Sequence, residues 1–285
     1  MNIRGAVREL IAAACRGKIR VGSAVFQRRY FHRDAVAFDS FRQRHEESLT
    51  RWIRFALDRN RDGAAVDVGV NLGQTLLKIL LMDRNRRYLG FEPQVACCYF
   101  VQRFILDNAL ENCRLFPFGL STRDQMVMIK TRRSGTFAGA SIVEGIRESS
   151  FYDCEAPVIV RTGDDVWREL ESPEVALLKV DVEGGELEVL QGLSECLKAN
   201  QPVVIFEVLH HRNVPAEMFR KEEERCAQLF DFFVSQSYAI YRIEPDSELA
   251  LISRFEPPER YDESLSNYVA LPSSAMIPAT MNRAS

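Results

Sequence analysis

The feature that most constrains the fold is a short apolar run that ends in a glycine-rich turn, AAVDVGVNLGQ at residues 64–74. The run is too short for a helix but suits a parallel strand buried on both faces. The turn carries Gly69, Asn71 and Gly73. Apolar residues then recur at helical spacing, at Leu72, Leu76, Leu77, Leu80 and Leu81. The stretch predicts strand, turn and helix, with a helix start whose backbone N–H groups can face a ligand.

Asp67 is an acid inside this apolar strand. A buried carboxylate without a partner costs several kcal/mol, so Asp67 needs a donor or a cation. One option is a cationic ligand above the turn, and the other is a cap made with backbone N–H groups of the loop. Open α/β sheets bind ligands at the carboxyl ends of their strands, and we therefore expect Asp67 to contact a ligand.

The chain continues as strands that alternate with helices, which predicts a Rossmann-like, mostly parallel α/β sheet. Seven strands are expected, the last two as an antiparallel finish, at residues 64–68, 87–91, 114–118, 175–182, 202–208, 238–243 and 266–271. The alternation of strands and helices is interrupted between residues 125 and 160. Short strands and a Gly/Ser/Thr-rich segment at 134–141 predict a β-hairpin insertion that borders the substrate.

Glu92 ends the second predicted strand, 19 residues after Gly73. In a doubly wound sheet this tip lies next to the first turn, where a carboxylate can accept two hydrogen bonds from ribose hydroxyls. Capping of the helix that begins at Pro93 is the alternative. After the third strand, Gly119 is expected to line the adenine side of a nucleotide pocket.

The fourth predicted strand carries Lys179, Asp181 and then Glu183 at alternate positions. Side chains two residues apart share one face of a strand, so all three are expected on one face at its exit. A structural ion pair needs only two charges, and we expect it between Lys179 and Asp181. The third charge indicates a polar site at the carboxyl edge of the sheet.

The fifth predicted strand also ends in chemistry-bearing residues. Glu207 lies in an otherwise apolar run, and His210 and His211 follow it. Imidazoles near a carboxylate can accept protons, which makes both histidines candidate bases. Surface histidines without a role are the alternative.

Composition indicates a soluble globular protein, with 46% apolar and 27% charged residues among 285. No apolar run approaches the ~18 residues of a membrane-spanning helix. The seven cysteines contain no C-x-x-C pair, which favours thiols in a reducing compartment over disulfides or a zinc site. A cytoplasmic protein is therefore expected.

Positive charge is concentrated at the N-terminus, where residues 1–62 hold 14 Arg and Lys against 7 Asp and Glu, net +7, leaving −10 for the rest. Apolar spacing predicts a basic helical extension over 1–62, before a main domain over 63–272 and a tail over 273–285. We expect these basic side chains to form a solvated face of the helices. Contact with a phosphorylated substrate, peripheral contact with anionic lipid and a mitochondrial presequence are the alternatives.

Five segments occur in order between residues 64 and 272: VDVGVNLGQ, GFEP, LLKVDVEGGELEVLQGL, PVVIFEV and NYVALP. Together they resemble the FkbM family of S-adenosylmethionine-dependent methyltransferases, and KVDVEGGE is the most specific part. Val70 and Gly185 stand where the family usually has Ala, which are small changes in size. The resemblance implies a class I methyltransferase fold, and it does not cover residues 1–62.

The resemblance also implies roles for the residues singled out above. Asp67, Gly69, Asn71 and Gly73 would hold the methionine end of S-adenosylmethionine, and Glu92 its ribose. The family is associated with O-methylation of hydroxyls on sugars, glycans and natural products, so the expected partner is a small-molecule or glycan acceptor.

An alcohol is a poor nucleophile at neutral pH, so methyl transfer to oxygen calls for a general base. The candidates at strand ends are Asp181, His210, Glu183 and His211, with Asp181 the first choice and His210 the second. Asp181, Glu183 and His210 also offer ligands for a divalent ion. Nothing in their spacing enforces ligand geometry, and no metal is expected.

Two other functional classes stay open from the sequence. A nicotinamide-dependent oxidoreductase uses a similar scaffold, although the G-x-N-x-G turn departs from the G-x-G-x-x-G fingerprint. The second is a catalytically inactive module that binds S-adenosylmethionine. Methylation of nucleic-acid amino groups is not expected, because no D/N-P-P-Y/F segment follows the fourth strand.

Overall fold

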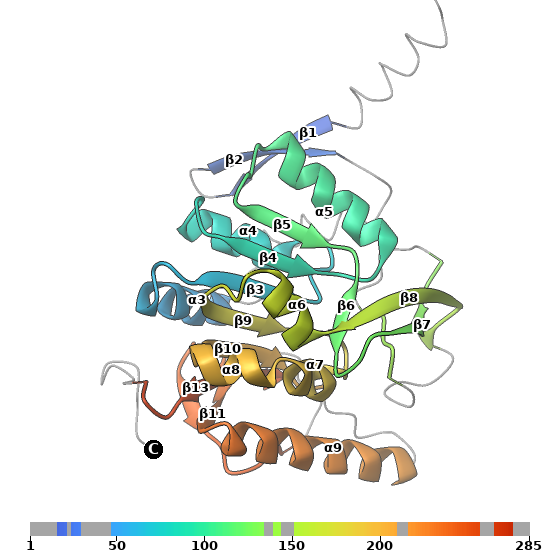
Figure 1. The fold of residues 1–285 in the computed structure, drawn as a ribbon, viewed down its shortest axis with the longest axis vertical. Coiled ribbons are helices and arrows are strands. Elements are labelled where there is room, and N and C mark those ends of the chain that lie inside the picture. The colour runs from blue at the N-terminus through green and yellow to red at the C-terminus, as the bar shows by residue number, and fades with distance from the viewer. Residues whose placement is uncertain are drawn as a thin grey trace, which may run out of the picture.

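The computed structural model describes residues 16–21, 24–29, 47–133, 139–143, 151–209, 216–256 and 265–275. Its centre is an eight-stranded sheet in the spatial order β12-β11-β13-β10-β9-β3-β4-β5 (Figure 1). In chain order these strands are β3 (Ala64–Val68), β4 (Tyr88–Phe91), β5 (Cys113–Phe116), β9 (Val175–Val180), β10 (Val203–Glu207), β11 (Tyr238–Ile243), β12 (Leu249–Leu251) and β13 (Asn267–Pro272).

The strand directions confirm the predicted Rossmann-like class. The five neighbours from β10 to β5 run parallel. β13 lies between β10 and β11 and runs antiparallel to both. It is therefore a reversed strand in the part of the sheet that the C-terminal segments of the chain form. The prediction of seven strands is wrong by one, because β12 pairs with β11 at the edge. Three residues are too few to show a period of two in the sequence.

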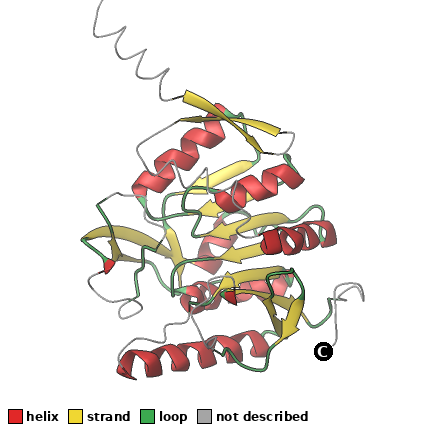
Figure 2. Cartoon of the chain, turned by 180° about the vertical axis from the view of Figure 1, so that it is seen from behind, coloured by secondary structure: helices red, strands yellow, loops and turns green. Residues whose placement is uncertain are grey.

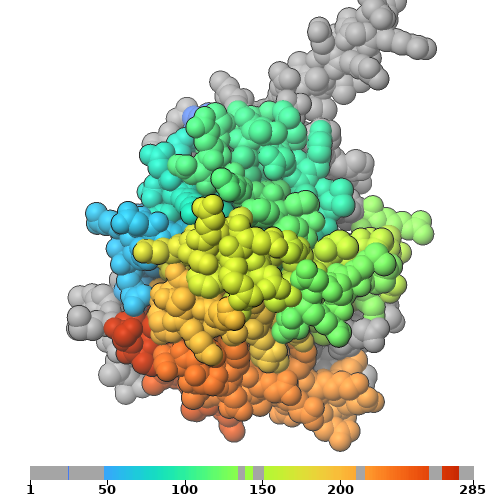
Figure 3. All heavy atoms as spheres, viewed as in Figure 1, coloured from blue at the N-terminus to red at the C-terminus, as the bar shows by residue number. Residues whose placement is uncertain are grey.

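Helices cover both faces of the main sheet. One face, seen from behind in Figure 2, packs against α3 (Glu47–Arg59), α4 (Gln74–Met82) and α5 (Val95–Asp107) around a core that includes Trp52, Leu76 and Phe104. The other face carries α6 (Gly163–Glu169), α7 (Glu186–Gly192), α8 (Ser194–Asn200) and α9 (Ala216–Ser235). In the space-filling view the yellow atoms around α6 occupy the middle of this face (Figure 3).

A second sheet projects on the side where the parallel strands end (Figure 1). It contains β6 (Gly119–Ser121), β7 (Gln125–Thr131) and β8 (Cys154–Thr162) in the order β6-β8-β7. β7 and β8 pair antiparallel, which confirms the predicted hairpin insertion. Most of its predicted Gly/Ser/Thr-rich loop lies outside the described residues.

The predicted helical extension over residues 1–62 is wrong for part of the chain. β1 (Arg16–Val21) and β2 (Ala24–Arg29) form an antiparallel hairpin. Two runs with β-branched and aromatic residues, separated by Gly22 and Ser23, are typical of a hairpin, and the concentration of arginine obscured this pattern. The helix expected over residues 3–14 lies outside the described residues, as does the first part of the one expected over 34–60.

Helix α3 is the described helical part of this N-terminal region, and it packs into the main core. The Trp52 side chain is fully buried and its indole N–H donates to the Ser247 carbonyl at 3.0 Å. Next to it, Arg51 Nη1 lies 3.1 Å from Glu248 Oε1. These contacts join α3 to the turn that precedes β12. Of the helices in the described ranges, none has the length and apolar character needed to cross a membrane.

Candidate functional site

The turn after β3 brings the ends of β3 and β9 into close approach. Gly69 has a φ of 88°, and a Cβ placed there would lie 1.8 Å from the Asp181 carbonyl oxygen. Gly73 has a φ of 89°, and its nearest neighbour would be Val101 Cγ2 at 3.5 Å. Asn71 adopts a φ of 49°. Gly69 is therefore required both by its φ and by space, whereas Gly73 is required only by its φ.

Asp67 lies at the centre of the site and is 1% exposed. Its Oδ2 accepts a 2.6 Å hydrogen bond from the Tyr88 hydroxyl of β4. Burial raises the pKa of Asp67 to about 7, against the opposing effect of the Tyr88 hydrogen bond. A neighbouring strand thus supplies a donor to Asp67, whereas the alternative to a ligand contact that the sequence left open is a cap made with backbone N–H groups of the loop. Gly90 was the sequence signal: a Cβ there would lie 2.8 Å from Tyr88 Cε1, so only glycine leaves room for this ring. The ligand contact of Asp67 stays a prediction.

Glu92 follows β4 and is 3% exposed. Its Oε2 accepts from the Asn71 backbone N–H and its Oε1 from the Gln94 backbone N–H, each at 2.7 Å. Burial raises the pKa of Glu92 to about 7, although both hydrogen bonds oppose the shift. Glu92 therefore fastens the glycine turn to the start of α5. The alternative that Glu92 caps a helix beginning at Pro93 is wrong, because α5 begins at Val95 with Gln94 as its N-cap. The ribose contact stays a prediction.

Asp181 directly follows β9 and pairs with Lys179, as predicted, at 3.0 Å. The Lys179 side chain is 4% exposed, whereas that of Asp181 is 37% exposed. Burial acts to raise the pKa of Asp181, but Lys179, a hydrogen bond with Glu207 and the charge of Lys78 together leave that pKa below its usual range. Asp181 is consequently an ionised carboxylate that solvent or a ligand can reach.

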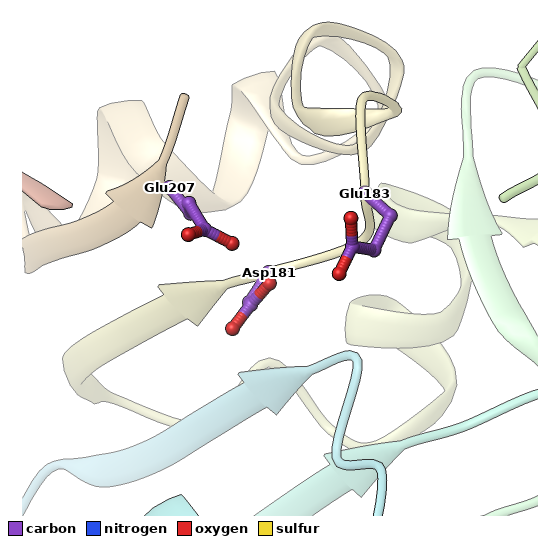
Figure 4. Close-up of side chains that lie close together, drawn as sticks. All are labelled: Asp181, Glu183 and Glu207. Atoms are coloured by element: carbon purple, nitrogen blue, oxygen red, sulfur yellow. The ribbon is translucent and has the colours of Figure 1, made fainter. Parts of the chain in front are cut away.

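Glu183 and Glu207 turn toward Asp181 (Figure 4). One oxygen from each of the three carboxyls lies within 4.8 Å of the others. The sequence flagged Glu207 as unusual but did not make it a site residue, because its relation to Asp181 depends on the pairing of β9 with β10. An acidic cluster of this kind does not identify a metal site, and the absence of a metal stays a prediction.

Lys78 is a site residue that sequence reasoning missed. It is 7% exposed on α4, whose other residues between Leu76 and Leu81 are apolar. Burial lowers the pKa of Lys78 to about 7, Lys179 adds to the shift and Asp181 opposes it. A lone lysine in an apolar helix was the available signal.

The three acids predicted to converge do share one neighbourhood. After burial and the Tyr88 hydrogen bond, Lys179 lowers the pKa of Asp67, while Asp181 and Glu92 raise it. Asp67 also lies directly beside Lys179 in the pairing of β3 with β9. The carboxyl edge of the sheet thus gathers acids from the ends of β3, β4 and β9.

Of the other predicted site residues, Gly119 is among those that the structure describes, and the two histidines are not. Gly119 begins β6, and a Cβ there would lie 3.2 Å from Val160 Cγ1 and 3.7 Å from Pro93 Cγ. It is therefore next to the residue that follows Glu92. His210 and His211 lie outside the described residues.

The loop that carries Glu183 is held from three sides. The Ser141 hydroxyl donates to the Glu183 carbonyl at 2.8 Å. Glu186 Oε1 accepts from the Gly184 backbone N–H at 3.0 Å, and Arg225 donates to the Gly184 carbonyl at 2.8 Å. These contacts support a φ of 56° at Glu183, a conformation that is uncommon outside glycine.

Comparisons with known proteins place this arrangement in a family. Residues 67–238, more than half of the chain, match the "Methyltransferase FkbM domain". The comparison with curated proteins gave no match. A methyltransferase FkbM structure from Methylobacillus flagellatus KT is 17% identical with a TM-score of 0.44, and the match covers 73% of this chain.

That match covers only 44% of the Methylobacillus flagellatus chain, so this chain spans less than half of its length. A SAM-dependent O-methyltransferase from Thermotoga maritima is 11% identical with a TM-score of 0.38, over 92% of this chain and 79% of that one. The domain match confirms the resemblance seen in the sequence. The chain belongs to the FkbM methyltransferase family.

Proposed function

We propose that this protein is an S-adenosylmethionine-dependent methyltransferase that acts on a hydroxyl oxygen of a sugar, glycan or natural-product acceptor. The observation that carries the proposal is that the turn after β3 joins three acids: it begins directly after the strand of Asp67, Gly69 lies against the Asp181 backbone, and the Asn71 N–H donates to Glu92. Family membership supports methyl transfer. The choice of oxygen as acceptor atom rests on what the family is associated with.

The residues at this edge fit S-adenosylmethionine. When bound, that molecule supplies a methyl group on a positively charged sulfur that leaves as a neutral thioether. Asp67 offers a carboxyl whose ionised form suits its positively charged groups. Glu92 already accepts one backbone N–H on each oxygen, but a carboxylate oxygen can accept a second hydrogen bond, so ribose hydroxyls remain suitable donors.

The chain's own residues would then do two things. The turn with Gly69 and Gly73 leaves backbone open to close approach by a ligand. Asp181, held by Lys179, accepts the proton that the acceptor hydroxyl gives up as its oxygen forms the bond to carbon. Positioning is worth ~7–11 kcal/mol of barrier for well-aligned reactants, and a base adds roughly 10²–10⁴-fold. Asp181 is an adequate base despite its lowered pKa, because an alkylated hydroxyl is strongly acidic.

The test combines calorimetric binding of S-adenosylmethionine with transfer of a labelled methyl group to a panel of hydroxylated sugars and metabolites. Asp181→Asn is expected to keep cofactor affinity and lose turnover by roughly 10²-fold or more. Glu92→Gln is expected to weaken cofactor binding. Glu111→Gln, an exposed acid before β5, is the control and leaves both unchanged.

The outcomes separate the alternatives. A wild-type protein that does not bind S-adenosylmethionine contradicts the proposal. Binding without transfer to any acceptor favours the inactive binding module. Loss of binding in Asp181→Asn contradicts its assignment as the base.

A further inference from the structure

The ends of β9 and β10 place two carboxyls side by side. Phe206 pairs with Val180 at the last step of the parallel register, where β9 ends; Glu207 follows Phe206 and Asp181 follows Val180. Adjacent residues in register point to the same face of a parallel sheet. Figure 4 shows Glu207 and Glu183 on opposite sides of Asp181, with the Glu207 carboxyl turned toward Asp181.

The surroundings of Glu207 differ from those of Asp181. Glu207 Oε1 accepts a 2.6 Å hydrogen bond from the Ser266 hydroxyl just before β13. The Lys179 ammonium lies at Asp181, 3.0 Å from its Oδ2. The charged groups that act on Glu207 among the described residues are Asp181, Lys179 and Glu183. The positive charge of Lys179 thus compensates the charge of Asp181, whereas Glu207 has a neutral hydroxyl as its hydrogen-bond donor.

This asymmetry decides which carboxyl holds a proton. Burial raises the pKa of Glu207 well above its usual value, and the negative charge of Asp181 raises it further. Burial also acts on the pKa of Asp181, but Lys179 and a hydrogen bond with Glu207 lower it. An oxygen of Glu207 and one of Asp181 lie within 4.8 Å of each other. Two ionised carboxylates at this separation repel, which favours one proton shared by the pair.

We propose that Glu207 is a positioning residue that carries this proton and donates it in a hydrogen bond to Asp181, so that Asp181 stays ionised and correctly oriented toward the acceptor hydroxyl. Its effect on turnover rests on the proposed function, because Asp181 is the base there. The protonation of Glu207 does not rest on it. The two parts are therefore tested by separate measurements.

The first measurement needs no catalysis. Carboxyl-carbon NMR of the labelled wild-type protein, without ligand, follows each Glu side chain with pH. The resonance that is missing from Glu207→Gln identifies Glu207. We expect it to show a protonated carboxyl at neutral pH, whereas an ordinary Glu ionises near about 4.3. A Glu207 resonance that titrates near that ordinary value overturns the proposal, whatever the protein catalyses.

The second measurement uses turnover with a labelled methyl donor. Glu207→Ala removes the donor and is expected to lower kcat by about 10–100-fold, the size of a hydrogen bond to a charged group. The KM for S-adenosylmethionine stays close to that of the wild type. In Glu207→Gln the side-chain amide again donates to Asp181, and most of the lost kcat returns.

The pH profile distinguishes positioning from a general loss of structure. Wild-type activity falls at alkaline pH as Glu207 loses its proton, since the donor disappears and two carboxylates then repel. Glu207→Gln has no proton to lose and lacks this alkaline limb. If Glu207→Gln is as inactive as Glu207→Ala, an ionised Glu207 is required and the proposal is wrong. An alkaline limb that persists in Glu207→Gln also contradicts it.

Discussion

At the scale of single residues, the site contains buried carboxyls whose ionisation is unfavourable in the ligand-free protein. Asp67 and Glu92 are both nearly inaccessible, and burial raises each pKa to about 7. Asp67 accepts a hydrogen bond from the Tyr88 hydroxyl, and Glu92 accepts from the backbone N–H groups of Asn71 and Gln94, all of which are neutral donors. A positively charged ligand next to these two carboxyls would therefore favour their ionised forms and lower their pKa values.

The first residue-scale prediction concerns stability. Asp67 binds its proton up to about pH 7 when folded but only to about pH 4 when unfolded. The folded state therefore holds more protons between these values, and stability falls as pH rises through this window. The accumulated cost is about 4 kcal/mol. Urea unfolding without ligand at pH ~5 and pH ~8 should show a smaller loss of stability in Asp67→Asn than in the wild type. Asp124→Asn is the control: Asp124 is exposed, and the Thr162 backbone N–H and Arg161 lower its pKa, so it is ionised at both pH values and its loss should leave the pH dependence of the wild type unchanged.

The second residue-scale prediction concerns binding. A cationic ligand stabilises the ionised forms of Asp67 and Glu92, which are partly protonated near pH ~7. Binding of S-adenosylmethionine is expected to release protons there, and its affinity to rise with pH. Calorimetry in buffers with different ionisation enthalpies counts the protons. S-adenosylhomocysteine lacks the sulfonium charge and should release fewer, and equal release with both ligands would contradict this account.

At the scale of elements, the two glycines of the turn after β3 form a matched pair. Both have a left-handed φ, but only Gly69 also meets the backbone of Asp181. Gly73→Ala is expected to cost about 1–2 kcal/mol, which is the strain of a side chain in that region. Gly69→Ala adds a steric clash that must separate β3 from β9, so it should cost more than about 3 kcal/mol. Chemical denaturation measures both, and similar costs would show that the close approach relaxes easily.

Arg86, between α4 and β4, is a second element-scale determinant. It is 6% exposed, and its guanidinium donates to the carbonyl of Leu57 in the last turn of α3 and to those of Asn60, Arg61 and Gly63 in the turn before β3. Arg86→Met leaves these acceptors without their donor, and we expect a loss of about 3 kcal/mol in unfolding free energy. The exposed neighbour Arg87 provides the control, since Arg87→Met should change stability by less than about 0.5 kcal/mol.

The sequence predicts what is local and periodic. The turn at Gly69 and the pairing of Lys179 with Asp181 lie within one strand–turn or strand–exit segment, so spacing alone was sufficient. Tyr88 and Glu207 act on residues of other strands, and their roles depend on strand order and register, which spacing does not contain. β12 was missed because three residues show no period, and the β1–β2 hairpin because charge masked its alternation.

At the scale of the whole molecule, the methyltransferase family match begins at residue 67, but the packed core begins earlier. Leu49, Trp52 and Ile53 of α3 are almost fully buried in the same apolar cluster as Leu76 of α4 and Val269 of β13. The boundary predicted at residue 62 therefore does not separate two independently packed parts.

The contacts of Trp52 with Ser247 and of Arg51 with Glu248 have a practical consequence for making shorter versions of this protein. A fragment that begins at residue 63 keeps every segment of the family signature yet leaves a tryptophan-sized void against the turn before β12. We expect it to aggregate or to lack a cooperative thermal transition. A fragment that begins at residue 45 retains α3 and should melt cooperatively, so calorimetry of these two fragments tells whether the first helix is an accessory or a component of the catalytic domain.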